Sequence, residues 1–195
     1  MEENKKRRGR LDLPAERKLI TVMFADIAGF TGLAETMDPE QVRDLMNACF
    51  EQLVPAVTQY GGTVDKFIGD EIMALFGAPV AHENDPERAL RAALSMQEAI
   101  TAFNAAHGLH LEAHFGINTG LVIAGSIGTS SQQNYSVMGD AVNLAAHLGH
   151  LSQRGEILVG PDTYRRTHHL FSFKALGPLR VKGKADPVPV YKLMG

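Results

Sequence analysis

The chain has few of the features that mark secreted or membrane proteins. It contains one cysteine, Cys49, and no tryptophan among 195 residues. A single cysteine excludes an internal disulfide framework and is typical of a reducing compartment, so we expect a cytoplasmic location. No apolar run approaches the roughly 18–20 residues that span a bilayer, so we expect no transmembrane segment. The basic N-terminal stretch has no apolar stretch after it, so we expect that it is not a secretory signal.

The chain also lacks a large excess of positive or negative charge. The net charge is −3, and 45% of the residues are hydrophobic, which is ordinary for a globular domain and gives no reason to expect a nucleic-acid partner. Basic residues are concentrated only in Lys5–Arg10, without aromatic neighbours. We interpret residues 1–15 as a basic tail or a linker to an upstream regulatory domain, and residues 16–195 as one domain. An electrostatic tether to a membrane or nucleic acid is the alternative for the tail.

Hydrophobic periodicity predicts strands and helices in alternation. Residues 19–26 are an apolar, β-branched run that predicts a buried strand. Helices are predicted over 39–59, opened by Asp38 and a proline, and over 85–106. Pro55 should kink the first of these helices or end it early.

Two hairpins and a C-terminal extension complete the predicted order. The first hairpin lies within residues 62–77 and turns at Gly69-Asp70; the second lies within 111–128 and turns at Asn118–Gly120. The remaining predicted elements are a helix at 140–151, a strand at 156–159, a short helix at 161–166, and strands at 170–175 and 188–193. This is an α+β fold: a ferredoxin-like βαββαβ sheet with helices on one face and a C-terminal βαβ-type extension.

Two carboxylates are expected at neighbouring strand ends. Asp26 closes the first strand, and Asp70 lies at the first hairpin turn. Together they favour a hard, oxygen-rich site for Mg²⁺ or Mn²⁺, although each residue alone is as often a turn or cap residue. The intervening loop 27–32, IAGFTG, offers small residues and free backbone N–H groups for phosphates. Glu71 is expected to point to the opposite face and to be structural.

Five segments in order resemble the catalytic domain of class III adenylyl and guanylyl cyclases. They are "FADIAGFT", "GGTVDKFIGDEIMALFG", "FGINTG", "YSVMGDAVNLAAHL" and "VKGKADPVPVYKL", and the resemblance covers about residues 16–194. It implies a cyclase catalytic domain over 16–195 that forms a head-to-tail homodimer with active sites built across the interface.

The resemblance also implies roles for individual residues. Asp26 and Asp70, with the backbone carbonyl of Ile27, would hold two ions of Mg²⁺ or Mn²⁺. Backbone amides at Phe30 and Thr31 would bind the triphosphate.

The base, ribose and terminal phosphates would be bound by the partner subunit. Lys66 matches the adenine-reading lysine and favours ATP. Ser136 occupies the second base-reading position and resembles a threonine-bearing subgroup, some of whose members respond to bicarbonate. A serine hydroxyl both donates and accepts, so Ser136 is also compatible with guanine. Asn143 matches the residue that orients the ribose, and Lys182 matches a lysine that reaches the β- and γ-phosphates.

His147 departs from the family pattern. The resemblance places an arginine here, one turn after Asn143, to stabilise charge on the α-phosphate. Histidine is shorter, and its ordinary pKa of about 6.5 leaves most of it neutral at pH 7. Three interpretations stay open: a weaker substitute, a nearly inactive domain, or replacement by another group such as Arg154 or a heterodimer partner. Of the other histidines, none has the spacing of a zinc site, and His114 is expected to be a hydrogen-bonded core or interface residue.

The sequence therefore predicts an adenylyl cyclase that converts ATP to 3′,5′-cyclic AMP and pyrophosphate by a two-metal mechanism. The alternatives are a guanylyl cyclase and a catalytically impaired nucleotide-binding or dimerisation module.

Overall fold

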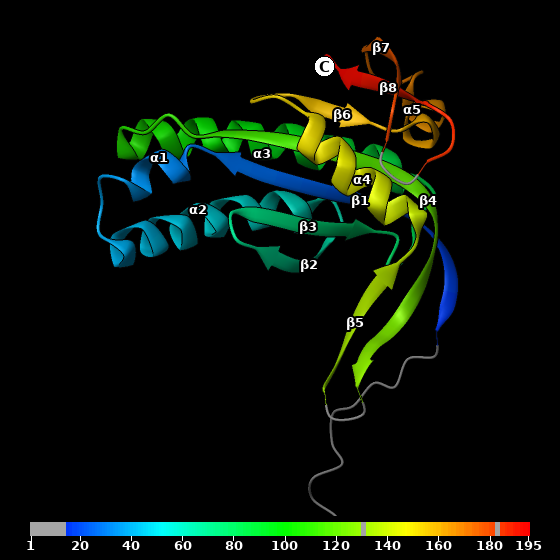
Figure 1. Cartoon of the computed structure of the whole chain (residues 1–195), viewed down its shortest axis with the longest axis horizontal. Coiled ribbons are helices and arrows are strands. Elements are labelled where there is room, and N and C mark those ends of the chain that lie inside the picture. Colours follow the sequence, from blue (N-terminus) through cyan, green and yellow to red (C-terminus); the bar gives the residue numbers. More distant parts are fainter. Residues whose placement is uncertain (1–14, 130–131, 182–183) are drawn as a thin grey trace, which may run out of the picture.

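A single mixed sheet organises the chain in a computed structural model, which describes residues 15–129, 132–181 and 184–195 (Figure 1). Seven of its eight strands follow the order β2-β3-β1-β4-β6-β8-β7, and β5 pairs with β4 off this path. The strands are β1 (Glu16–Ala28), β2 (Thr63–Ile68), β3 (Glu71–Phe76), β4 (Glu112–Thr129), β5 (Gln132–Met138), β6 (Ile157–Val159), β7 (Phe173–Leu179) and β8 (Val188–Leu193). The helices are α1 (Phe30–Ala34), α2 (Pro39–Gln59), α3 (Asp85–His107), α4 (Asp140–Leu151) and α5 (Pro161–Thr167). No helix within the described ranges is long and apolar enough to cross a membrane.

The predicted βαββαβ order and the first hairpin are confirmed. Strand β1 lies between β3 and β4 and pairs antiparallel with both. Its neighbour on the hairpin side is β3, with β2 outside it. The first strand therefore ends beside the start of β3, immediately after the hairpin turn.

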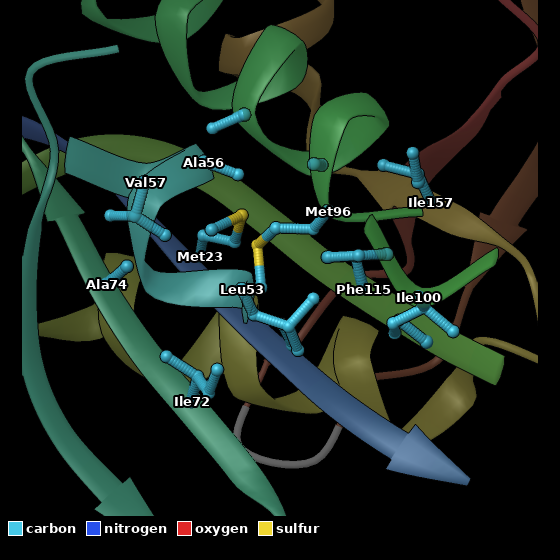
Figure 2. Packing of buried hydrophobic residues seen from close by; sticks show 14 of the residues in the cluster. Met23, Leu53, Ala56, Val57, Ile72, Ala74, Met96, Ile100, Phe115 and Ile157 are labelled. Carbon is cyan, nitrogen blue, oxygen red and sulfur yellow. The ribbon is translucent and has the colours of Figure 1, made fainter. Parts of the chain in front are cut away.

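Helices cover both faces of the sheet, so the prediction of helices on one face is wrong. Met23 and Ala25 of β1 pack in the cluster formed with α2 and α3, which Figure 2 shows around Leu53 and Met96. Val22 and Phe24 instead pack with residues of α4 on the other face. The physical reason is the continuous apolar run of β1, which needs cover on both faces.

Strand β4 runs without a turn through Asn118–Gly120, so the predicted second hairpin is wrong there. The polar side chains that suggested a turn are satisfied inside the sheet. Asn118 donates to the carbonyl of Ala141 in α4 at 3.2 Å, and the Thr119 hydroxyl lies 2.9 Å from those of Thr21 and Thr163. The hairpin partner of β4 is β5, a strand that the sequence did not predict.

Helix α2 covers the predicted range 39–59 and continues through Pro55, so the early end, one of the two effects predicted for this proline, does not occur. Glu51 and Pro55 both lie on the exposed face of this helix. Water can therefore satisfy the carbonyl of Glu51, which the proline leaves without an intrahelical donor.

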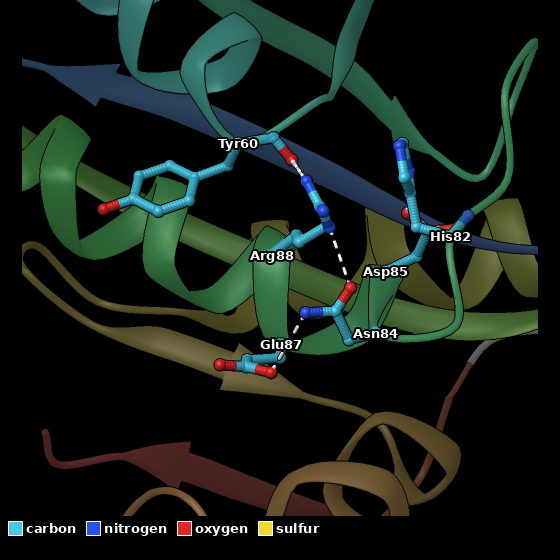
Figure 3. Close-up of polar contacts among 6 residues, drawn as sticks. All are labelled: Tyr60, His82, Asn84, Asp85, Glu87 and Arg88. Carbon is cyan, nitrogen blue, oxygen red and sulfur yellow. Dashed lines mark hydrogen bonds and ion pairs between the residues drawn. The ribbon is translucent and has the colours of Figure 1, made fainter.

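The start of α3 is tied to the end of α2 by polar contacts (Figure 3). Arg88 donates to the carbonyl of Tyr60 at 3.2 Å and to the side chain of Asn84 at 2.8 Å. Asp85 is buried, accepts from the backbone N–H of His82 at 2.8 Å, and has its other oxygen 3.1 Å from the His82 ring. The Arg88–Tyr60 contact joins the two helices, and the other contacts order the start of α3.

Candidate active site

Asp26 and Asp70 meet where the sequence places them, at adjoining strand ends. Asp26 is the direct cross-strand partner of Glu71, and Asp70 is the residue before Glu71 in the β2–β3 turn. The turn needs the left-handed backbone of Gly69, whose φ is +64°. Burial, and after it the charge of Asp26, raise the pKa of Asp70. The two carboxylates are therefore close enough to repel each other.

Glu71 belongs to this acidic group, so the prediction that it faces away is wrong. Directly opposed residues on adjacent antiparallel strands point to the same face, and Glu71 stands opposite Asp26. Burial, followed by the charge of Asp26, raises the pKa of Glu71. Its buried Oε1 has no hydrogen-bond partner among the described residues. The antiparallel pairing of β1 with β3, which the sequence left open, is the signal that would have found it.

His114 adjoins the same group from β4. It is the direct partner of Asp26 on that strand, and its Nε2 lies 3.4 Å from Oδ2 of Asp26. Its Nδ1 lies 3.1 Å from the carbonyl of Gly149 and 2.9 Å from the hydroxyl of Ser152, at the end of α4. The predicted hydrogen-bonded histidine is confirmed, and its contact with a candidate metal ligand is new.

These residues fit a divalent cation. Carboxylate oxygens are the ligands that Mg²⁺ and Mn²⁺ prefer, and a cation would offset the repulsion between Asp26 and Asp70. No group of three or more His, Cys, Asp or Glu side chains in the described part of the chain has a metal-binding arrangement. The remaining ligands would come from backbone carbonyls, such as that of Ile27, and from substrate phosphates. The Ile27 side chain itself is buried against α2 and α3.

The loop after β1 leads directly into α1. Gly29 precedes the helix with φ +119°, a conformation that glycine adopts without strain. Phe30 begins α1 and its side chain is buried in the core, so only its backbone faces the loop. Thr31 is the second residue of this helix. Lys182 lies outside the described residues.

Lys66 and Ser136 are brought together from strands far apart in the sequence. Lys66 Nζ lies 3.4 Å from the Ser136 hydroxyl, and both contact the carboxylate of Asp65. Lys66 lies within β2, whereas Asp70 lies beyond the end of that strand, in the turn to β3. The two base-reading candidates thus form one cluster, and no hydrogen bond or ion pair of the described residues joins it to Asp26 or Asp70.

Helix α4 carries Asn143 and His147 one turn apart. Asn143 is exposed, whereas His147 is half-buried and its buried Nε2 has no partner in the described ranges. Arg154, the alternative cation, is exposed in the turn after α4. Close packing fixes the helix on β4, because a Cβ on Gly116 would lie 2.0 Å from the backbone nitrogen of Gly149. Among the described residues, no hydrogen bond or ion pair joins Asn143 or His147 to the Lys66–Ser136 cluster or to Asp26 and Asp70.

The fold is that of nucleotide cyclase domains. Residues 14–195 match the model of the Adenylate and Guanylate cyclase catalytic domain, and the chain belongs to that family. Adenylate cyclase 1 of Rhizobium meliloti is 33% identical over 187 residues, which cover 93% of this chain and 28% of that protein.

Solved structures confirm the fold. The crystal structure of the adenylyl cyclase CyaB from P. aeruginosa matches with a TM-score of 0.89 and 34% identity, covering 94% of this chain and 97% of that one. The guanylyl cyclase Cya2 matches with a TM-score of 0.85 and 33% identity, covering 93% and 94%. Since similar structures of both kinds have nearly equal identity, the choice of base has to be argued from this chain's own residues.

Proposed function

We propose that this domain converts ATP to 3′,5′-cyclic AMP and pyrophosphate. The observation that carries the proposal is the meeting of Asp26 and Asp70, beside the unpartnered oxygen of Glu71, in a domain of the cyclase family. A phosphate-transfer site of this kind needs acidic side chains that hold cations against a triphosphate.

The reaction forms one bond and breaks one. The ribose 3′-oxygen bonds to the α-phosphorus, the bond from that phosphorus to its bridging oxygen breaks, and pyrophosphate leaves with the electron pair. The hydroxyl proton passes to solvent. Two ions of Mg²⁺ or Mn²⁺, when bound, would lower the pKa of the 3′-hydroxyl and neutralise phosphate charge. Asp26, Asp70 and the carbonyl of Ile27 would hold them.

The other candidate residues would bind and orient the nucleotide. Backbone amides at Phe30 and Thr31 would bind the phosphates, together with Lys182. Asn143, exposed on α4, would orient the ribose, and His147 would stand beside the α-phosphate. Lys66 and Ser136 would bind the adenine.

The site would be shared across a head-to-tail homodimer. Among the described residues of one chain, no hydrogen bond or ion pair joins the Lys66–Ser136 cluster, the Asp26–Asp70 pair, and Asn143 with His147 to one another. A second copy would supply what each half lacks. An apolar patch supports such an interface: Leu121, Ile123 and Met138 are 66%, 42% and 57% exposed, and Ile123 and Met138 are direct cross-strand partners.

Two other functions have specific support. His147 replaces a permanently charged arginine, which favours a catalytically impaired nucleotide-binding or dimerisation module. The similarity to a guanylyl cyclase structure favours GTP as a substrate.

A product assay tests the proposal. The native chain is incubated with ATP or GTP and Mg²⁺ or Mn²⁺, and both cyclic nucleotides are measured. We expect cyclic AMP as the main product, and none from Asp70→Asn. Cyclic GMP as the main product would favour the guanylyl alternative, and no product from a folded, nucleotide-binding chain would favour the impaired module. Full activity of Asp70→Asn would refute the role of this carboxylate.

A further inference from the structure

Asp65 is a buried carboxylate beside the two base-reading candidates. Its side chain is 3% exposed, against 48% for Lys66. A register shift between Val64 and Lys66 makes Asp65 the extra residue of a bulge in β2. Strand alternation would send neighbouring side chains to opposite faces, but a bulge redirects one of them. Asp65 and Lys66 therefore both reach Ser136.

The hydrogen bonds of this cluster use up most of its donors and acceptors. The Ser136 hydroxyl donates to Oδ2 of Asp65 at 2.8 Å. Lys66 Nζ lies 3.1 Å from the same oxygen and donates to the Ser136 oxygen at 3.4 Å. A hydroxyl has one proton and two lone pairs, and an ammonium has three protons. Counting the contacts between described residues, Ser136 is left with one lone pair and no free proton, and Lys66 is left with one free N–H.

We propose that Asp65 determines base specificity by keeping Ser136 a hydrogen-bond acceptor. The inference rests on the proposed function, in which Lys66 and Ser136 contact the base. Asp65 itself does not touch the nucleotide; it acts through the Ser136 hydroxyl. A serine free of this carboxylate could rotate and donate, which would suit either base.

The remaining donor and acceptor match adenine. On its Watson–Crick edge adenine offers an acceptor, N1, beside a donor, the N6 amino group. Guanine offers the reverse, the donor N1–H beside the acceptor O6. Lys66 would donate to adenine N1, and Ser136 would accept from N6. Against guanine, the Lys66 donor would face the N1–H donor, and the Ser136 acceptor would face the O6 acceptor. These polar groups would be left unpaired, which is how hydrogen-bonding sites reject analogues.

Removing the carboxylate tests this inference. Asp65→Leu and the smaller Asp65→Ala both free the Ser136 proton, and the second variant covers the case in which the first does not fold. Binding constants are measured for α,β-methylene-ATP and α,β-methylene-GTP, which cannot release pyrophosphate, alongside kcat/KM for ATP and GTP.

The expected result is a change in preference rather than a general loss. The native chain should bind the ATP analogue more tightly, and the ratio of the two binding constants should fall at least about tenfold in the Asp65 variants, since one matched pair of base contacts is worth about that much or more. Asp85→Leu is the matched control, because it removes another buried carboxylate, whose hydrogen bonds to described residues go to His82 and not to the base-reading cluster. It should leave the ratio unchanged even if it lowers stability.

The outcomes separate this inference from the proposed function. A ratio within about twofold of native in a folded Asp65 variant, or equal loss for both nucleotides, would overturn the role of Asp65. A native preference for the GTP analogue would also overturn it. A chain that prefers the ATP analogue through Asp65, but makes no cyclic AMP, would refute the proposed reaction and support the specificity inference.

Discussion

Replacing Gly116 by alanine should push helix α4 away from strand β4. A Cβ at this position would lie 2.0 Å from the backbone nitrogen of Gly149 and 2.1 Å from the carbonyl oxygen of Ala145. Ordinary van der Waals contact begins near 3.4 Å. The atoms involved are backbone, so no side chain can turn aside, and the helix has to move by about 1.4 Å.

The shift should affect both stability and activity. Overpacking of a core contact costs about 1–3 kcal/mol, and a clash with backbone belongs at the upper end of that range. For a chain of this size, about 3 kcal/mol lowers Tm by roughly 6–12 °C. Because α4 carries Asn143 and His147, a displacement of more than 1 Å should also lower cyclic AMP formation about 100-fold.

Gly149→Ala is the matched control on the facing helix. Its Cβ would lie 3.5 Å from the nearest atom, Cβ of Phe24, which is ordinary contact. Alanine is also the better helix former, by about 0.8–1.0 kcal/mol. Urea unfolding should therefore show Gly149→Ala as stable as the native chain or more so, and Gly116→Ala as clearly weaker. A Gly116→Ala variant with native stability and activity would refute the inference that this crossing fixes α4.

Three further predictions concern the acidic group and His147. Glu71→Gln should stabilise the metal-free chain by about 0.2–1 kcal/mol, because it removes a like charge directly opposite Asp26. The pKa of Glu71 is raised in the folded state, so this gain in stability should be complete at pH values above the folded pKa and should vanish as the pH falls below the ordinary pKa of the carboxyl. Urea unfolding at several pH values measures the gain and its pH dependence, and a gain that grows on acidification would contradict the prediction. Removing divalent cations with EDTA should abolish cyclic AMP formation and lower Tm. Added Mn²⁺ or Mg²⁺ should restore the activity and the Tm of the native chain but not those of Asp70→Asn. Activity that survives chelation would exclude the metal mechanism. His147→Arg should raise the rate of cyclic AMP formation at least about tenfold, since one preorganised donor at a developing charge is worth about 10²–10³; an unchanged or lower rate would mean that His147 does not stand at the α-phosphate.

The sequence predicted the elements whose signals are local. The apolar run that ends at Asp26 and the periodicity of α2 and α3 gave those elements to within a few residues, and Gly69-Asp70 marked a true hairpin turn. The turn predicted at Asn118 failed because the partners of its polar side chain lie far away in the sequence. A single sequence does not show that Asn118 will bond to α4.

The residues of the candidate site also differ in whether the sequence alone could predict their positions. Sequence reasoning was sufficient to place Asp26 with Asp70, from the order of the strands, and Lys66 with Ser136, from the motif resemblance. It missed Glu71 and His114, because their place beside Asp26 follows from which strands are neighbours. It also missed Asp65, whose orientation depends on a bulge in β2 that alternation alone does not predict.

Mixing two inactive variants tests the shared active site most directly. Asp26→Asn removes a carboxylate from one half of the proposed site, and Asn143→Ala removes the ribose contact from the other half. Each variant alone should make little cyclic AMP from ATP. An equal mixture should recover about a quarter of the native activity, because half of the dimers are mixed and each has one intact site of two. A mixture that stays inactive, although mixed dimers form, would contradict the shared adenylyl cyclase site.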